Sequence, residues 1–112
     1  PYGLAAIETL KALGLAEALQ PKVVTGESVT QAWQFVASGN AELGFVAYSQ
    51  THAEGRLIGG SYWLVPARYY RPIRQDAVVL VKGKGVAAVD ALAGFLKSPA
   101  AADIIKSYGY DR

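Results

Sequence analysis

The sequence predicts an α/β domain in which helices cover both faces of a mixed, mostly parallel sheet. Segments with helical periodicity alternate with short apolar segments, and these apolar segments are too uniformly hydrophobic to keep one face in water. Because parallel neighbours in a sheet need a crossover helix between them, the alternation favours parallel pairing. The length of 112 residues corresponds to one domain. We therefore expect a single packed unit of strands and helices.

The predicted helices are marked by caps and by apolar residues three or four positions apart. Ser28 and Gln31 have the spacing of a capping box. Ser98 and Pro99 are typical of an N-cap and a first helical residue. Gly14, Gly39 and Gly109 mark the ends of three of the predicted helices, as expected for a C-terminal cap. The predicted helices span residues 4–13, 28–39, 89–97 and 98–109, with a short turn at residues 15–19.

The predicted strands are short apolar or β-branched segments between these helices. Residues 22–25 are β-branched, and the other three segments read as buried strands. The region between Ser49 and Ser61 has no periodicity, so we interpret it as a long surface loop. The predicted strands lie at residues 22–25, 43–47, 62–66 and 77–81.

The sequence does not predict an enzyme. His52 has Ser49 and Glu54 nearby, but adjacency in sequence does not make a triad. The run Gly83-Lys84-Gly85 lacks the other residues of a phosphate-binding loop, so a strand-to-helix turn explains it. One histidine and no cysteine exclude disulfides and make a zinc site implausible. We therefore expect no catalytic residue, no cofactor and no protein ligand to a metal.

Net charge and hydropathy bear on two classes of partner, nucleic acids and membranes. The formal net charge is +2 at pH 7, too small to indicate nucleic-acid binding. The segment from Arg56 to Lys84 does hold six basic side chains against one acid, but its charges are spread over several predicted turns, where solvated charge is ordinary. No apolar run approaches the length of a membrane span. We expect no nucleic-acid partner and no membrane insertion.

Two predicted helix starts carry the most informative chemistry. A small turn precedes each helix, at Pro1-Tyr2-Gly3 and at Gly26-Glu27-Ser28-Val29. The first N–H groups of a helix have no partner within it, and the helix dipole places partial positive charge there, so such ends bind oxyanions. In a parallel α/β sheet both starts would face one cleft. Ser28 is also explained as an ordinary cap without any ligand.

Several segments, in this order and spacing, resemble the carboxyl-terminal half of the periplasmic molybdate-binding proteins of ABC-type importers. The resemblance covers nearly the whole chain. The matching segments are Pro1-Tyr2-Gly3, Gly26-Glu27-Ser28-Val29-Thr30-Gln31-Ala32, Gly39-Asn40-Ala41-Glu42-Leu43-Gly44-Phe45-Val46-Ala47, Trp63-Leu64-Val65-Pro66, Gln75-Asp76-Ala77-Val78, Phe95-Leu96-Lys97-Ser98-Pro99, Ile104-Ile105 and Tyr108-Gly109-Tyr110.

This resemblance implies a periplasmic-binding-protein-like lobe that helps to close over molybdate or tungstate using neutral hydrogen bonds. It implies backbone N–H donors at Tyr2 and Val29, with Ser28 beside them. Some members use a tyrosine hydroxyl at the position of Ala47, and here Tyr48 is the next residue, so the source of that donor stays open. Molybdenum would be bound as an oxyanion, without protein metal ligands. Glu27 is expected to point away from the anion.

The resemblance also implies how the chain is organised and what it binds. Residues 1–75 would form one lobe of a two-lobed protein, and residues 76–112 would return to the other lobe. The chain would then be a truncated or excised piece of a longer periplasmic protein that delivers its oxyanion to a membrane permease. As a separate piece, it could pair with another copy of itself, which would make a domain-swapped dimer.

Two alternatives remain beside this interpretation. A sulfate- or phosphate-type binder shares the fold and would be distinguished by competition. The ligand-sensing domain of a transcription regulator shares the architecture and would carry a DNA-binding segment elsewhere in its chain.

Overall fold

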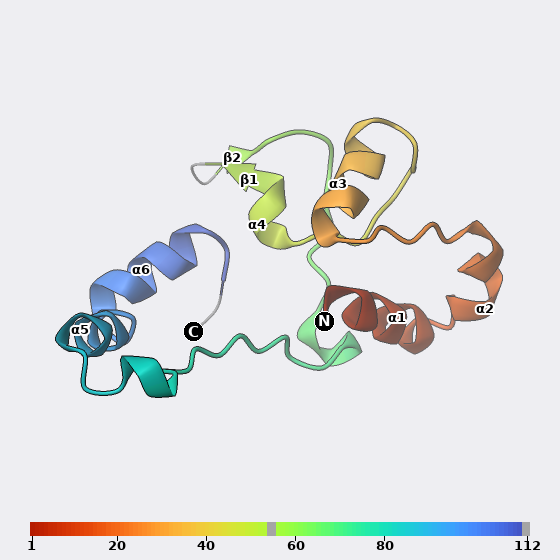
Figure 1. The fold of residues 1–112 in the computed structure, drawn as a ribbon. Coiled ribbons are helices and arrows are strands. Elements are labelled where there is room, and N and C mark those ends of the chain that lie inside the picture. Colours follow the sequence, from red (N-terminus) through yellow and green to blue (C-terminus); the bar gives the residue numbers. More distant parts are fainter. Residues whose placement is uncertain (54–55, 111–112) are drawn as a thin grey trace.

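The computed structural model describes residues 1–53 and 56–110, and it is dominated by helices separated by extended segments (Figure 1). Short 3₁₀ turns lie between several of them. The helices are α1 (Tyr2–Ala12), α2 (Ala16–Leu19), α3 (Val29–Ala37), α4 (Tyr48–Thr51), α5 (Ala87–Phe95) and α6 (Pro99–Ser107), the strands are β1 (His52–Ala53) and β2 (Arg56–Leu57), and the 3₁₀ turns are η1 (Gln20–Lys22), η2 (Ala67–Tyr69) and η3 (Val81–Gly83).

The caps predicted from the sequence are formed. The Ser28 hydroxyl accepts a hydrogen bond from the Gln31 N–H at 3.1 Å, which begins α3. The Gln31 side chain reaches back one residue further than in a standard capping box, to the Glu27 N–H at 2.7 Å. Ser98 accepts from the Ala101 N–H at 3.2 Å at the start of α6. Local side-chain chemistry therefore determines where these helices begin.

The four predicted strands do not pair in the part of the chain that the structure describes. The sheet found there has two strands, antiparallel β1 and β2, with His52 opposite Leu57. It lies in the region predicted to be an irregular loop, which also contains α4, so that prediction was wrong. A strand needs a neighbour to take up its backbone hydrogen bonds, and residues 22–25, 43–47, 62–66 and 77–81 meet none here.

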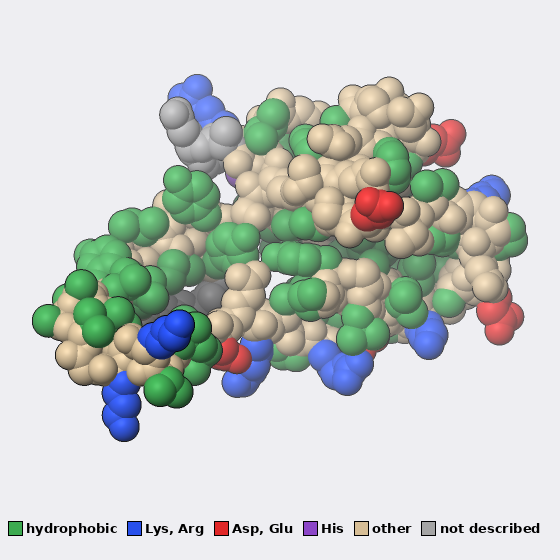
Figure 2. Space-filling model, viewed as in Figure 1, with side chains coloured by type: hydrophobic (Ala, Val, Ile, Leu, Met, Phe, Trp, Pro, Cys, Tyr) green, Lys and Arg blue, Asp and Glu red, His purple; other side chains and the backbone are tan. Residues whose placement is uncertain are grey.

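Apolar side chains on these unpaired segments are exposed. Leu43 is 89% exposed and Val81 is 90% exposed, while Trp63 is 59% exposed. Among the residues whose burial is described, the buried hydrophobic ones are Ala47 and Ala101. Figure 2 shows hydrophobic side chains spread across the surface, including the end formed by α5 and α6. The apolar surface that a sheet would cover is therefore open.

The dimensions agree with this exposure. The radius of gyration is 17.5 Å, against about 13 Å for a compact domain of this length. The accessible surface is 9186 Å², against roughly 6,000 Å² for a folded monomer of this mass. Helices α5 and α6 lie apart from α1 to α4, connected by an extended segment (Figure 1). The chain therefore exposes surface that a compact globular domain of this length would bury.

Candidate functional site

The start of α3 presents a free backbone donor. The Ser28 hydroxyl accepts a hydrogen bond from the Gln31 N–H, and the Ser28 carbonyl accepts one from the Ala32 N–H. The N–H of Val29, the first residue of the helix, donates to no acceptor within the described residues. Glu27, which precedes the cap, is exposed. An N–H at this position carries the positive end of the helix dipole and suits an anion.

Gln50 connects the start of α3 to the start of α4. Its Oε1 accepts a hydrogen bond from the Ala47 N–H at 3.2 Å, and its Nε2 donates to the Thr30 Oγ1 at 3.3 Å. Thr30 directly follows Val29. Sequence reasoning missed Gln50, although its place three residues after Ala47 is the position from which a glutamine reaches back to a helix start.

The start of α1 is held by a second set of side chains. The Tyr2 hydroxyl accepts from the Gln75 Nε2 at 3.4 Å and shares a hydrogen bond with the Tyr110 hydroxyl. Burial raises the pKa of Tyr2 above its ordinary value of 10.0, and Tyr110 raises it further. The hydroxyl of Tyr110 also lies 3.1 Å from the Ser49 Oγ on α4. The starts of α1 and α4 are therefore linked through Tyr110.

Together these contacts join three helix starts by neutral groups alone. The side chains that carry the links are amides and hydroxyls, from Thr30, Gln50, Ser49, Tyr110, Tyr2 and Gln75. The network thus connects Tyr2 with Thr30, the residue that directly follows Val29. Such a site offers hydrogen-bond donors and helix dipoles rather than a cationic side chain.

Ala47 and Tyr48 are both in contact with other residues of this chain. Ala47 is 6% exposed, and its N–H is taken by Gln50. The Tyr48 ring lies 4.4 Å from the His52 ring and 5.7 Å from the Tyr62 ring, measured between centroids. A hydrogen bond with Tyr62, together with burial, raises the pKa of Tyr48. The Tyr48 hydroxyl is therefore already engaged by Tyr62.

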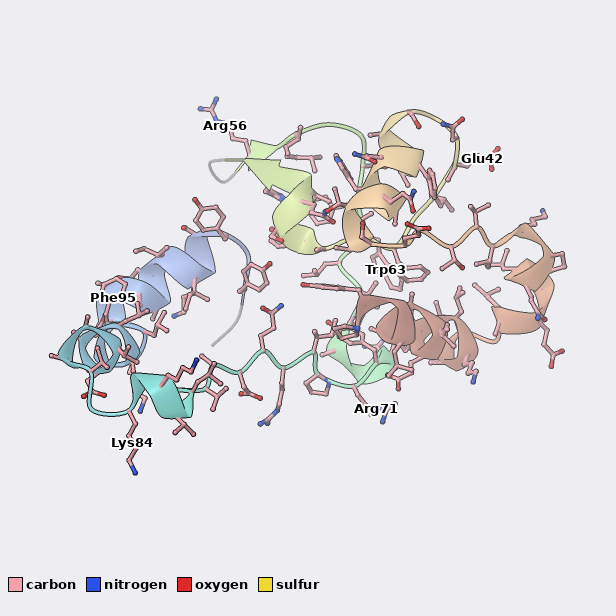
Figure 3. The ribbon with its side chains drawn as sticks, in the orientation of Figure 1. Glu42, Arg56, Trp63, Arg71, Lys84 and Phe95 are labelled. Atoms are coloured by element: carbon pink, nitrogen blue, oxygen red, sulfur yellow. The ribbon has the colours of Figure 1, made fainter. Side chains whose placement is uncertain are left out.

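The other candidate residues from the sequence are far apart or already bonded to neighbouring side chains. His52 bonds the Thr51 hydroxyl at 2.8 Å within this aromatic group, and Glu54 lies outside the described residues. Arg56, Arg71 and Lys84 project at three separate places (Figure 3), and basic side chains on the visible face of Figure 2 do not gather into one patch. Arg71 pairs with Glu8 at 2.6 Å.

Two kinds of feature are absent from the described residues. No group of three His, Cys, Asp or Glu side chains there is arranged to hold a metal ion. None of the helices described is long and apolar enough to cross a membrane.

Known proteins resemble this chain over its whole length. The family described as bacterial extracellular solute-binding protein matches residues 1–111. Molybdate-binding protein ModA of Azotobacter vinelandii is 58% identical over 110 residues, covering 98% of this chain and 44% of that protein. Molybdate-binding protein ModA of Rhodobacter capsulatus is 54% identical, with 98% and 42% covered.

A solved structure of a similar protein has the same fold as this chain. The periplasmic molybdate-binding protein of Azotobacter vinelandii superposes with a TM-score of 0.88 at 42% identity, covering 100% of this chain and 49% of that one. The chain therefore spans less than half the length of these relatives.

Proposed function

This chain belongs to the bacterial extracellular solute-binding protein family, and from that premise we propose that it is the carboxyl-terminal part of a protein that binds molybdate or tungstate. Two relatives that are more than half identical to it are named molybdate-binding proteins. The whole protein would lie in the periplasm and deliver its oxyanion to the membrane permease of an ABC importer. It would carry no cofactor of its own.

The observation that carries this proposal is the neutral network joining the starts of α1 and α3. An oxyanion needs several N–H or O–H donors at about 2.7 to 3.1 Å. Tyr2 and Val29 would each give a backbone N–H, because the first N–H groups of α1 and α3 have no partner within their helices. Helix ends held by Gln50 and Tyr110 would fix the spacing of these donors. A fixed spacing favours the longer Mo–O or W–O bonds over the shorter bonds of sulfate.

The remainder of the longer protein would complete both the fold and the site. Residues 1–75 would form one lobe, with its sheet completed by strands from outside this chain, and residues 76–112 would return to the other lobe. The exposed apolar segments on both sides of residue 75 and the large accessible surface support a covering partner that this chain does not supply. A second copy of the chain would cover the same segments in a domain-swapped dimer when the remainder is missing. Ser28 and Ala47 would shape the wall near the anion without donating side-chain hydrogen bonds to it.

The test joins this chain to the part of the Azotobacter vinelandii protein that it does not match, and titrates the product with molybdate by calorimetry. Val29→Pro removes one N–H and replaces the valine side chain while preserving the helix start, since proline is favoured at the first helical position. Ser28 already has extended backbone, φ −146° and ψ 162°, as a residue before proline requires. Val29→Ala is the matched control, because it shortens the side chain and keeps the N–H.

We expect Val29→Pro to weaken molybdate binding by roughly 10- to 100-fold, the effect of one hydrogen bond to a charged group. Val29→Ala should stay within about threefold. Excess sulfate should not displace molybdate from the unsubstituted protein. Displacement by sulfate or phosphate would favour the alternative oxyanion binder, and equal loss in both variants would remove Val29 N–H from the site.

A further inference from the structure

The end of the described chain returns to the helix starts that form the candidate site. Helix α6 ends at Ser107, and the two residues Gly109 and Tyr110 contact α1 and α4. The end of α6 faces α4 in Figure 1. This return is made by a segment about 60 residues away from α4 in sequence, so it is a tertiary contact and not a local turn.

Gly109 is needed at this position for two independent reasons. Its φ is +81°, a conformation that other residues adopt only with strain. A Cβ on Gly109 would collide with the ring of Tyr48, the first residue of α4. The ring of Tyr48 therefore packs directly on the Gly109 backbone, which a larger residue would prevent.

Tyr110 supplies the polar half of this contact. Its hydroxyl lies 3.1 Å from the Ser49 Oγ and shares a hydrogen bond with the hydroxyl of Tyr2. Tyr2 is also held from its other side by Gln75 at 3.4 Å. The first residue of α1 is thus held between Gln75, the last residue of the predicted lobe, and Tyr110, which belongs to the part of the chain expected to leave this lobe.

We propose that Gly109 and Tyr110 form a clasp that positions Tyr2, and with it the first N–H of α1, relative to the start of α4. This inference rests on the proposed function, because it makes the end of the chain a determinant of how the oxyanion is held. Tyr110 is a positioning residue that does not touch the anion. Through Ser49, Gln50 and Thr30 the same clasp is connected to the start of α3.

The main variant is Tyr110→Phe, which keeps the ring and removes the hydroxyl that bonds Tyr2 and Ser49. The matched control is Tyr108→Phe, at the same end of α6, where the tyrosine is 65% exposed. Each is made in the 112-residue chain, for backbone amide spectra by NMR, and in the protein joined to the remainder of its relative, for molybdate affinity. Tyr2→Phe and the double variant Tyr2→Phe with Tyr110→Phe complete a cycle.

We expect Tyr110→Phe to shift the amide signals of Tyr2 and Ser49 and to weaken molybdate binding about threefold to tenfold, with Tyr108→Phe unchanged in both. The double variant should lose less than the sum of the two single losses, because both remove the same hydrogen bond. A loss of stability alone would not produce this non-additive affinity.

Unchanged affinity in Tyr110→Phe, or additive losses in the double variant, would overturn the clasp while leaving the oxyanion proposal intact. Absence of molybdate binding in the unsubstituted joined protein would remove the proposed function instead. The clasp would then be judged by the amide signals of Tyr2 and Ser49, and unshifted signals would overturn it.

Discussion

Residues 1–75 and residues 76–110 are held together by different means. In the first region Thr9 and Thr51 are buried, and separate elements are linked by hydrogen bonds that Gln50 donates to Thr30 and that Glu8 accepts from Arg71. In the second region Ala101 is the buried residue among those described, and Val78 is 81% exposed. Polar side chains therefore connect the elements of the site region, whereas few buried residues hold the second region, and both regions leave apolar segments exposed.

Hydrogen exchange tests the difference between the two regions most directly. Amides of α1 bond carbonyls four residues earlier, whereas residues 77–81 lie in an extended segment without a strand partner. We expect exchange at residues 77–81 to be at least about 100-fold faster than in the middle of α1, a difference of roughly 2.7 kcal/mol in opening free energy. Equal protection in a dilute monomer would contradict the open segment, and protection that appears with concentration would indicate the swapped dimer.

A pair of neighbouring alanines on α6 tests whether this helix of the second region has a packed face. Ala101 is 3% exposed, and Ala100 beside it is exposed. Ala101→Leu should lower the free energy of unfolding by about 1 to 3 kcal/mol, because the added atoms have no space. Ala100→Leu should change it by less than about 0.5 kcal/mol. Urea unfolding of both variants measures the difference, and similar values would show that α6 has no packed face.

The two serine caps test whether the regions unfold together. Ser28→Ala and Ser98→Ala each remove the acceptor for one N–H at a helix start, so each should cost about 1 kcal/mol. Ser→Asp at either position keeps an acceptor and serves as the control. If one cooperative unit exists, thermal unfolding followed by circular dichroism shifts as a whole for both variants. A shift of only part of the transition would show two independent regions.

The ion pair of the first region gives the smallest effect. The Arg71 N–H donates to Glu8 at 2.8 Å, and this bond, with the guanidinium, holds the pKa of Glu8 below its ordinary value of 4.5. A depressed carboxyl pKa stabilises the fold above that ordinary value, and the contribution is lost as the pH falls through the lower folded value. Glu8→Gln should remove this pH dependence of the unfolding midpoint below pH 4.5. Because the Arg71 side chain is 75% exposed, the change should be small and should shrink further in salt.

Much of the local structure and the family could be predicted from the sequence. Ser28, Ser98 and the glycines after the helices act through neighbours a few residues away, so their effect is visible in the sequence itself. The periplasmic-binding-protein-like fold implied by the resemblance is confirmed by the superposition on a solved member. The details of the sheet remain a prediction, as do the lobe boundary at residue 75 and the site residues.

The contacts that organise the site could not be predicted. Gln50 and Tyr110 act on residues 20 or more positions away, and no local pattern marks them. The region of α4 and the hairpin lacks periodicity because its elements are only two to four residues long. Strand pairing depends on a neighbouring segment, so apolar character at residues 77–81 indicates burial without naming what buries it.

Trp63 is a natural fluorescence probe of the open apolar segments. It is 59% exposed on one of the open apolar segments, near the ring of Tyr69, whereas Trp33 is half-buried on α3. Indole emission moves to shorter wavelength when the ring leaves water. The moment at which the open segments become covered can therefore be followed by the intrinsic fluorescence of Trp63, with a Trp63→Phe variant leaving Trp33 as the internal reference.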